Sequence, residues 1–233
     1  MIPAALSRLG KSYWRKVALG AFWAGVWARG AAAITGVKVV VHGKIPESSG
    51  KLVVSNHLGY LDVLAHASVF KIRFAPKEEI KNWFLFGILV SLGSPVWIDR
   101  KSPRKSREYA EIFRETLEHE IALLVYPEGT SSDGRHGLLP FKSTPFAALP
   151  EKCEILPTLL FYRETPENSA PGAWFGDVGF LRHIWGVLGL KKILINMVIM
   201  PEILSLPGEQ RKELAFRVHA AMTKEYEKYE KLF

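Results

Sequence analysis

The stretch "VVSNHLGYLDVL", residues 53–64, holds the local pattern from which the fold of this chain can be inferred. Its apolar, β-branched start is typical of a buried strand, and residues 58–70 read as a helix. His57 and Asp62 stand five positions apart at the junction of the two segments. Two interpretations are open: the pair is catalytic, or it belongs to a surface turn in which both side chains meet water.

Strand-like and helical segments alternate along the rest of the chain. Strands are predicted at 37–46, 51–57, 72–80 (running into a helix start), 95–99, 121–129, 153–162 and 191–203, and helices at 82–94, 102–120 and 207–232. This order predicts an α/β fold with a mixed, largely parallel sheet flanked by helices. Residues 163–190, rich in Gly, Pro and aromatic side chains, fit either a loop followed by a helix or a second lipid-facing patch.

The N-terminal segment combines bases with aromatic side chains. Residues 1–46 contain no Asp or Glu, and their bases are Arg8, Lys11, Arg15, Lys16, Arg29, Lys38 and Lys44. Tryptophan and basic side chains both favour the headgroup level of a membrane, so we expect one or two amphipathic helices at 3–34 lying in the interface. The uncharged run 17–28 is shorter than the roughly 20 residues of a span. A true span and an ordinary helix packed on the protein's own core are the alternatives.

Bulk properties limit the partners. The chain has 233 residues, a net charge of +8 and 48% hydrophobic residues, and this basic yet apolar balance favours an anionic lipid surface over nucleic acid. A single cysteine, Cys153, excludes an intramolecular disulfide and fits the cytoplasmic face of a membrane. No metal-ligand spacing occurs among the histidines, so no metal is expected. Residues 1–35 are taken as a membrane-interface helical segment, and residues 36–233 as the main domain.

The spacing of His57 and Asp62 restricts how they can meet. On one helix, five residues place two side chains about 140° apart. If His57 ends the loop and Asp62 lies in the first helical turn, the carboxylate can accept a hydrogen bond from one ring nitrogen and leave the other as a base. A G-x-S-x-G nucleophile motif is absent, so the attacking group is expected to be a substrate hydroxyl.

The segment "NHLGYLD" (56–62) resembles the N-H-x4-D motif of the glycerolipid acyltransferases, the family that contains 1-acylglycerol-3-phosphate acyltransferases. Blocks similar to the family's other motifs follow in order: "GSPVWIDR" (93–100), "VYPEGTSSDG" (125–134), "LPFKSTPFAAL" (139–149) and "ILPTLL" (155–160). The resemblance covers about residues 37–203, and four blocks in order are far more specific than one.

The resemblance implies an O-acyltransferase, with residues 36–233 as its catalytic domain. Its donor would be acyl-CoA or acyl-carrier protein, and its acceptor a lysolipid such as 1-acylglycerol-3-phosphate, in membrane phospholipid biosynthesis. His57 would be the base and Asp62 would orient it. No cofactor beyond the donor substrate is implied.

The same resemblance implies residues that bind the acceptor. Glu128, Gly129 and Thr130 would hold the headgroup, and Gly129 would let the backbone approach it closely. Arg100 and Lys142 would bind a phosphate. Arg100 has an alternative as a surface arginine paired with a nearby acid.

Two features leave the acceptor open. Lys77 resembles a basic residue often found near the acceptor in this family, but a solvated helix start explains it equally well. Many lysophosphatidate enzymes read E-G-T-R, whereas this chain has Ser131 in place of the arginine. The alternatives are therefore an acyltransferase for another lysolipid, such as a lyso-ornithine lipid or a lysophospholipid, or a catalytically silent lipid-binding protein on the same fold.

Overall fold

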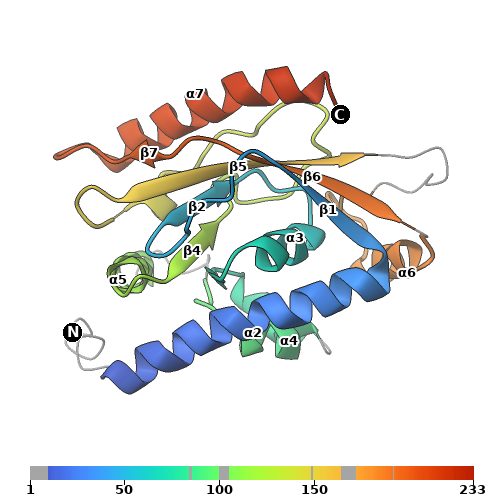
Figure 1. Ribbon diagram of the computed structural model, residues 1–233, viewed down its shortest axis with the longest axis horizontal. Coiled ribbons are helices and arrows are strands. Elements are labelled where there is room, and N and C mark those ends of the chain that lie inside the picture. Colours follow the sequence, from blue (N-terminus) through green and yellow to red (C-terminus); the bar gives the residue numbers. More distant parts are fainter. Residues whose placement is uncertain (1–9, 84–85, 100–104, 148, 164–171, 191) are drawn as a thin grey trace.

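A single sheet lies between two layers of helices (Figure 1). The computed structural model describes residues 10–83, 86–99, 105–147, 149–163, 172–190 and 192–233. Within them the strands are β1 (Val37–His42), β2 (Leu52–Ser55), β3 (Ile72–Phe74), β4 (Ala122–Val125), β5 (Glu154–Arg163), β6 (Ile193–Ile199) and β7 (Ile203–Leu204). Their order is β1-β6-β5-β2-β4-β3, with β7 beside β5. Only β5–β6 and β5–β7 pair in antiparallel fashion among these strands, so the predicted mixed, largely parallel sheet is confirmed.

The central strands are apolar on both faces because both faces are covered. The helices are α2 (Lys11–Thr35), α3 (Leu61–Val69), α4 (Phe86–Leu92), α5 (Ser106–Glu118), α6 (Phe180–Leu188) and α7 (Arg211–Glu230), with 3-10 turns η1 (Glu78–Asn82) and η3 (Thr144–Phe146). Val53 of β2 joins the core under α2, α3 and α6, whereas its neighbours Leu52 and Val54 join the core under α5 and α7. This alternation follows the two-residue period of a strand.

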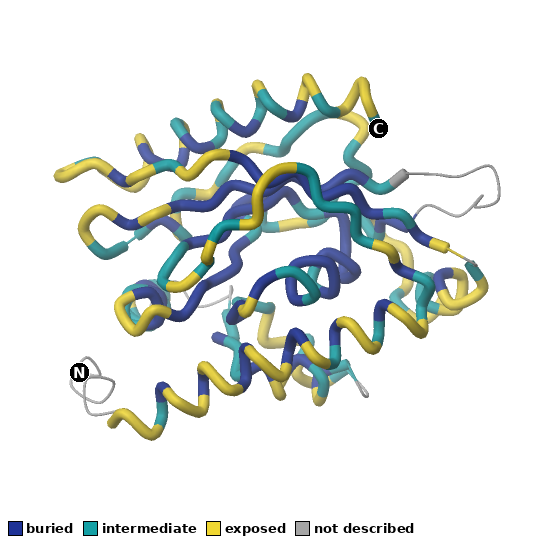
Figure 2. Tube along the Cα trace, in the orientation of Figure 1, coloured by how far each residue is buried: buried dark blue, intermediate teal, exposed yellow. Residues whose placement is uncertain are grey.

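The N-terminal helix α2 has two different faces (Figure 2). Its inner face consists mostly of small residues, including Ala21, Ala24 and Ala28, and packs on α3, β3 and α4. Its outer face exposes large apolar side chains. By length and composition alone, α2 could cross a membrane, although 39% of its most apolar window is buried against the protein. The helix ends at Thr35, before Gly36 with φ 70°; the division of the chain into a membrane segment and a catalytic domain stays a prediction.

Two predicted strands differ in the structure. Residues 95–99 form no regular strand: Val96 N–H donates to Phe74 O (2.8 Å), and Ile98 makes one isolated bridge to Lys77. Pro76 has no N–H to donate to Val96 O, the next bond of this parallel pairing, which explains why a full ladder with β3 does not form. The predicted strand at 191–203 is divided into β6 and β7, and in the ambiguous segment 163–190 the structure places α6.

Candidate active site

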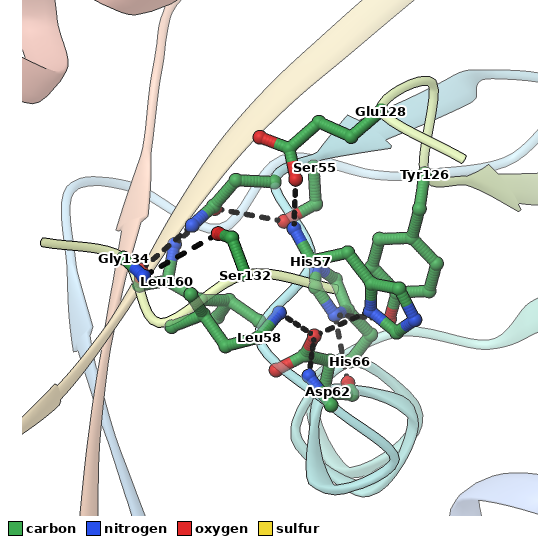
Figure 3. Close-up of polar contacts among 12 residues, drawn as sticks. Ser55, His57, Leu58, Asp62, His66, Tyr126, Glu128, Ser132, Gly134 and Leu160 are labelled. Carbon is green, nitrogen blue, oxygen red and sulfur yellow. Dashed lines mark hydrogen bonds and ion pairs between the residues drawn. The ribbon is translucent and has the colours of Figure 1, made fainter. Parts of the chain in front are cut away.

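The loop after β2 brings His57 and Asp62 together (Figure 3). Asn56 anchors the loop to β5, because its side chain donates to Leu160 O (3.0 Å) and accepts from Leu160 N–H (2.8 Å). Asp62 lies in the first turn of α3. His57 Nδ1 and Asp62 Oδ2 are 2.7 Å apart. The contact geometry predicted from the spacing is therefore present, while its catalytic use stays a prediction.

Asp62 is completely buried, and several donors compensate for the loss of water. Besides His57, its Oδ2 accepts from the backbone N–H groups of Leu58 (2.6 Å) and Gly59 (3.0 Å). Its Oδ1 accepts from the hydroxyl of Tyr162 at 2.5 Å. Burial, together with the charge of Asp62, raises the pKa of Tyr162 well above its usual value. Tyr162 therefore remains a protonated donor to this carboxylate.

Two side chains hold the ring of His57: Asp62 bonds its edge at Nδ1, and Tyr126 packs on its face. It stacks on Tyr126, with ring centroids 4.1 Å apart and planes at 15°. The His57 side chain is 24% exposed, whereas Asp62 has no exposure. With Nδ1 donating to Asp62, Nε2 is the nitrogen that can accept a proton.

A second histidine lies behind the pair. His66 is fully buried; its Nδ1 donates to the backbone oxygen of Asp62 (2.8 Å), and its Nε2 is 3.0 Å from Thr158 Oγ1. Burial lowers the pKa of His66 to about 4, so its ring is neutral. His66 therefore supports the start of α3 and adds no charge beside Asp62.

Glu128 joins two loops of the site. Its Oε2 accepts from His57 N–H (3.0 Å) and its Oε1 from Leu139 N–H (3.1 Å). The residue is only 4% exposed, and burial raises the pKa of Glu128 to about 7. Both oxygens are occupied by backbone donors, an arrangement that favours a role in holding the His57 loop. Direct contact with an acceptor headgroup stays a prediction.

Of the other predicted binding residues, some lie beside Glu128 and others do not. Gly129 has φ 75°, and a Cβ there would come within 2.5 Å of Lys142 Nζ, so the Lys142 side chain lies across this glycine. Thr130 and Lys142 are exposed beside Glu128. Lys77 is exposed at the start of η1, near the sheet edge. Arg100 lies outside the described residues.

Sequence reasoning missed Tyr126 and Tyr162. Both follow from topology: β2 lies between β4 and β5, and all three are parallel. Their carboxyl ends therefore meet at one edge of the sheet, where α/β folds place their ligand sites. Tyr126 directly follows β4, and Tyr162 lies near the end of β5. Aromatic hydroxyls at those two strand ends were the available signal.

A cavity of about 260 Å³ lies at the β3 edge of the sheet, away from this pair. It is lined by side chains that include Tyr13, Arg73 and Tyr109. Arg73 is buried there and donates to Ser94 O, Thr116 Oγ1 and the Tyr13 hydroxyl. Neither His57 nor Asp62 lines this cavity, so the chemistry of the site is not assigned to it.

Fold and site together define an α/β protein with a histidine–aspartate pair at the carboxyl ends of its central parallel strands. A family model described as Acyltransferase matches residues 37–160. The chain therefore belongs to the acyltransferase family and is an acyltransferase, as its motifs predicted.

Named relatives agree with this assignment. The chain is 32% identical to a lyso-ornithine lipid O-acyltransferase of Rhizobium meliloti, over 70% of this chain and 60% of the relative's length. It is also 32% identical to a 1-acyl-sn-glycerol-3-phosphate acyltransferase of Neisseria gonorrhoeae, over 72% of this chain and 67% of that one.

A solved structure shares the fold. The crystal structure of the 1-acyl-sn-glycerophosphate (LPA) acyltransferase PlsC from Thermotoga maritima superposes with a TM-score of 0.59 at 20% identity. The superposition covers 99% of this chain and 84% of that one. At this identity the likeness shows the fold alone.

Proposed function

We propose that this chain transfers a fatty acyl group from an acyl thioester to the hydroxyl of a lysolipid at a membrane surface. The observation that carries the proposal is the 2.7 Å contact between His57 Nδ1 and Asp62 Oδ2, which leaves Nε2 able to act as a base. His57 Nε2 takes the hydroxyl proton while the oxygen attacks the thioester carbonyl. The tetrahedral intermediate then expels the thiolate, which receives that proton from the imidazolium.

Asp62 orients the ring and stabilises the imidazolium formed in the first step. The reaction needs no acyl-enzyme, because a thioester is already activated. The donor is acyl-CoA or acyl-carrier protein, which is a substrate and not a resident cofactor.

The acceptor is a lysolipid, in agreement with the named activities of the two bacterial relatives. Its headgroup would lie beside the loop from Glu128 to Thr130, with Lys142, Arg100 and Lys77 as the candidate bases for a phosphate or carboxylate. Ser131, where many lysophosphatidate enzymes have arginine, favours a headgroup other than that of 1-acylglycerol-3-phosphate.

The partner surface we propose is the cytoplasmic face of an anionic membrane. Large apolar side chains are exposed on three helices: Leu19, Phe22, Trp23 and Val26 of α2, Ile88 and Leu92 of α4, and Leu181, Trp185 and Leu188 of α6. These helices are neighbours, because α2 packs on α4 and Phe180 of α6 lies 5.7 Å from Phe86 of α4 between ring centroids. We call this set the α2–α4–α6 surface. Since α2 has bases and no acidic residue, the surface suits anionic lipid.

Purified protein in mixed micelles, given labelled acyl-CoA or acyl-carrier protein and a panel of lysolipids, tests the proposal. We expect the panel to yield a labelled diacyl product and His57→Ala to lower kcat at least about 1,000-fold. His42→Ala is the matched control, because His42 also bonds a neighbouring side chain, Asn196 (2.9 Å), but lies on β1 at the edge of the sheet.

Wild-type turnover by His57→Ala would refute the base. Stoichiometric binding of lysolipid with no transfer from either donor would instead favour the catalytically silent lipid-binding alternative.

A further inference from the structure

We infer that Tyr162 and Tyr126 are positioning residues for the His57–Asp62 pair. Tyr162 orients the carboxylate and sets how strongly it attracts the imidazole proton, and Tyr126 fixes the plane of the ring. The inference rests on the proposed function, in which His57 is the base.

Tyr162 supplies what the local motif does not. The loop and helix start provide donors to Oδ2 of Asp62 only: His57 Nδ1 and two backbone N–H groups. Oδ1 is met by the Tyr162 hydroxyl, which comes from β5, a hundred residues further along the chain. With both oxygens bonded, the carboxylate cannot rotate about its Cβ–Cγ bond, and Oδ2 stays directed at His57.

The hydroxyl of Tyr162 also shares the negative charge of the carboxylate. A donor hydrogen bond to one oxygen of a carboxylate makes the other oxygen a weaker acceptor. Without this donor, Oδ2 would hold the His57 proton more firmly, and the imidazole would remain protonated up to a higher pH.

Tyr126 acts on the face of the ring. Its near-parallel stack on His57 leaves the imidazole one orientation in which Nδ1 still meets Asp62. The ring of His66 packs edge to face on Tyr126, with ring centroids 5.8 Å apart, and so supports the tyrosine on the side away from solvent.

Tyr162→Phe removes only the hydroxyl and tests the first role. We expect kcat to fall about tenfold, as for loss of one hydrogen bond to a charged group, with KM within about twofold of wild type. The acidic limb of the kcat/KM against pH profile should move to higher pH. Tyr226→Phe is the matched control: it also deletes a hydroxyl bonded within the fold, to Gly134 O, and should leave the limb in place.

An unchanged acidic limb in Tyr162→Phe would overturn the role of Tyr162, even if kcat fell. A limb that moved equally in Tyr226→Phe would overturn it too, because the shift would then reflect a general loss of packing.

Tyr126 is tested by a pair of variants. Tyr126→Phe keeps the stacked ring and should retain kcat within about threefold, whereas Tyr126→Leu removes the stack and should lose about tenfold. Equal kcat in the two variants, with both melting as cooperatively as wild type, would refute the stacking role.

The outcomes separate the two proposals. If His57→Ala is inactive but the acidic limb of the pH profile of Tyr162→Phe matches that of wild type, this inference about Tyr162 is wrong and the proposed function still stands. A fully active His57→Ala removes the proposed function itself, whatever the tyrosine variants do.

Discussion

Asp62 and Glu128 are both buried carboxylates of one site, but their partners differ. Asp62 receives hydrogen bonds from an imidazole, a phenol and two backbone groups. Glu128 receives two backbone N–H groups, and burial still raises its pKa to about 7. Glu128 is therefore expected to titrate near neutral pH, and its proton couples the stability of the His57 loop to pH.

The sign of this coupling can be measured with Glu128→Gln. Between about pH 4.5 and 7 the folded state keeps a proton on Glu128 that the unfolded chain has released. This contribution to stability is complete below about pH 4.5 and is lost as pH rises to 7. As pH rises through this range, the free energy of unfolding of wild type should therefore fall by up to about 3 kcal/mol relative to that of Glu128→Gln. The variant shows no such fall because its amide does not titrate. Denaturant unfolding at pH 5 and pH 8 checks this.

Comparing the two proteins at both pH values cancels the stability that the Glu128→Gln substitution loses at every pH. The amide introduced by Glu128→Gln has one acceptor oxygen and can take only one of the two backbone bonds, but that loss is the same at both pH values. A constant difference between the two proteins from pH 5 to pH 8 would show that Glu128 does not titrate in this range.

At the scale of elements, α2 shows how one helix can serve two surfaces. Its small residues let the backbone approach the rest of the fold closely: a Cβ at Gly20 would lie 2.6 Å from Ser94 Oγ and 3.1 Å from the backbone carbon of Gly93. Gly30, also on α2, has nothing within 4 Å of such a Cβ. The two glycines therefore differ in packing, although they share a helix.

Alanine substitutions at these glycines should change stability in opposite directions. Gly30→Ala should raise the free energy of unfolding by about 0.5–1 kcal/mol, because glycine is a poor helix former. Gly20→Ala should lower it by about 1 kcal/mol or more through overpacking. Thermal melts of both variants test this, and stabilisation by Gly20→Ala would show that α2 is not closely packed there.

At the scale of the whole molecule, the two outer layers differ in character. The α2–α4–α6 surface is apolar and basic, whereas α7 covers the opposite face of the sheet and carries acidic and basic residues together (Figures 1 and 2). Phe216 of α7 is 74% exposed, but it stands among charged neighbours. Only the α2–α4–α6 surface combines apolar side chains from several described helices.

Vesicle flotation distinguishes the two faces. Trp23→Ser and Trp185→Ser should each weaken binding to phosphatidylcholine vesicles that contain phosphatidylglycerol by about tenfold, the effect of losing one large inserted side chain. Phe216→Ser is the control and should bind as wild type does. Equal loss in all three variants, or no loss in any, would contradict the membrane orientation proposed for the α2–α4–α6 surface.

Much of the fold was predictable because its signals are local. The continuous apolar runs of β2, β4 and β5 indicate buried strands, and the apolar stripe of the charged helix α5 repeats with the helical period, so the sequence placed each of them. The segment at 95–99 was misjudged, because its apolar residues resemble a strand, while Pro76 on the neighbouring segment lacks the N–H that would continue the ladder. The faces of α2 were undetermined, since small residues fit both a membrane helix and a close helix contact.

The sequence by itself predicted the strand–helix alternation, and it allowed His57 to meet Asp62 if Asp62 lay in the first turn of the helix. The tertiary structure alone decided that Tyr162 completes the Asp62 carboxylate, that Tyr126 stacks on His57, and that Glu128 joins the His57 loop to Leu139. The physical reason is that these contacts depend on β2 lying between β4 and β5 in the sheet. Strand order is set by the packing of the whole domain, and no short stretch of the chain encodes it.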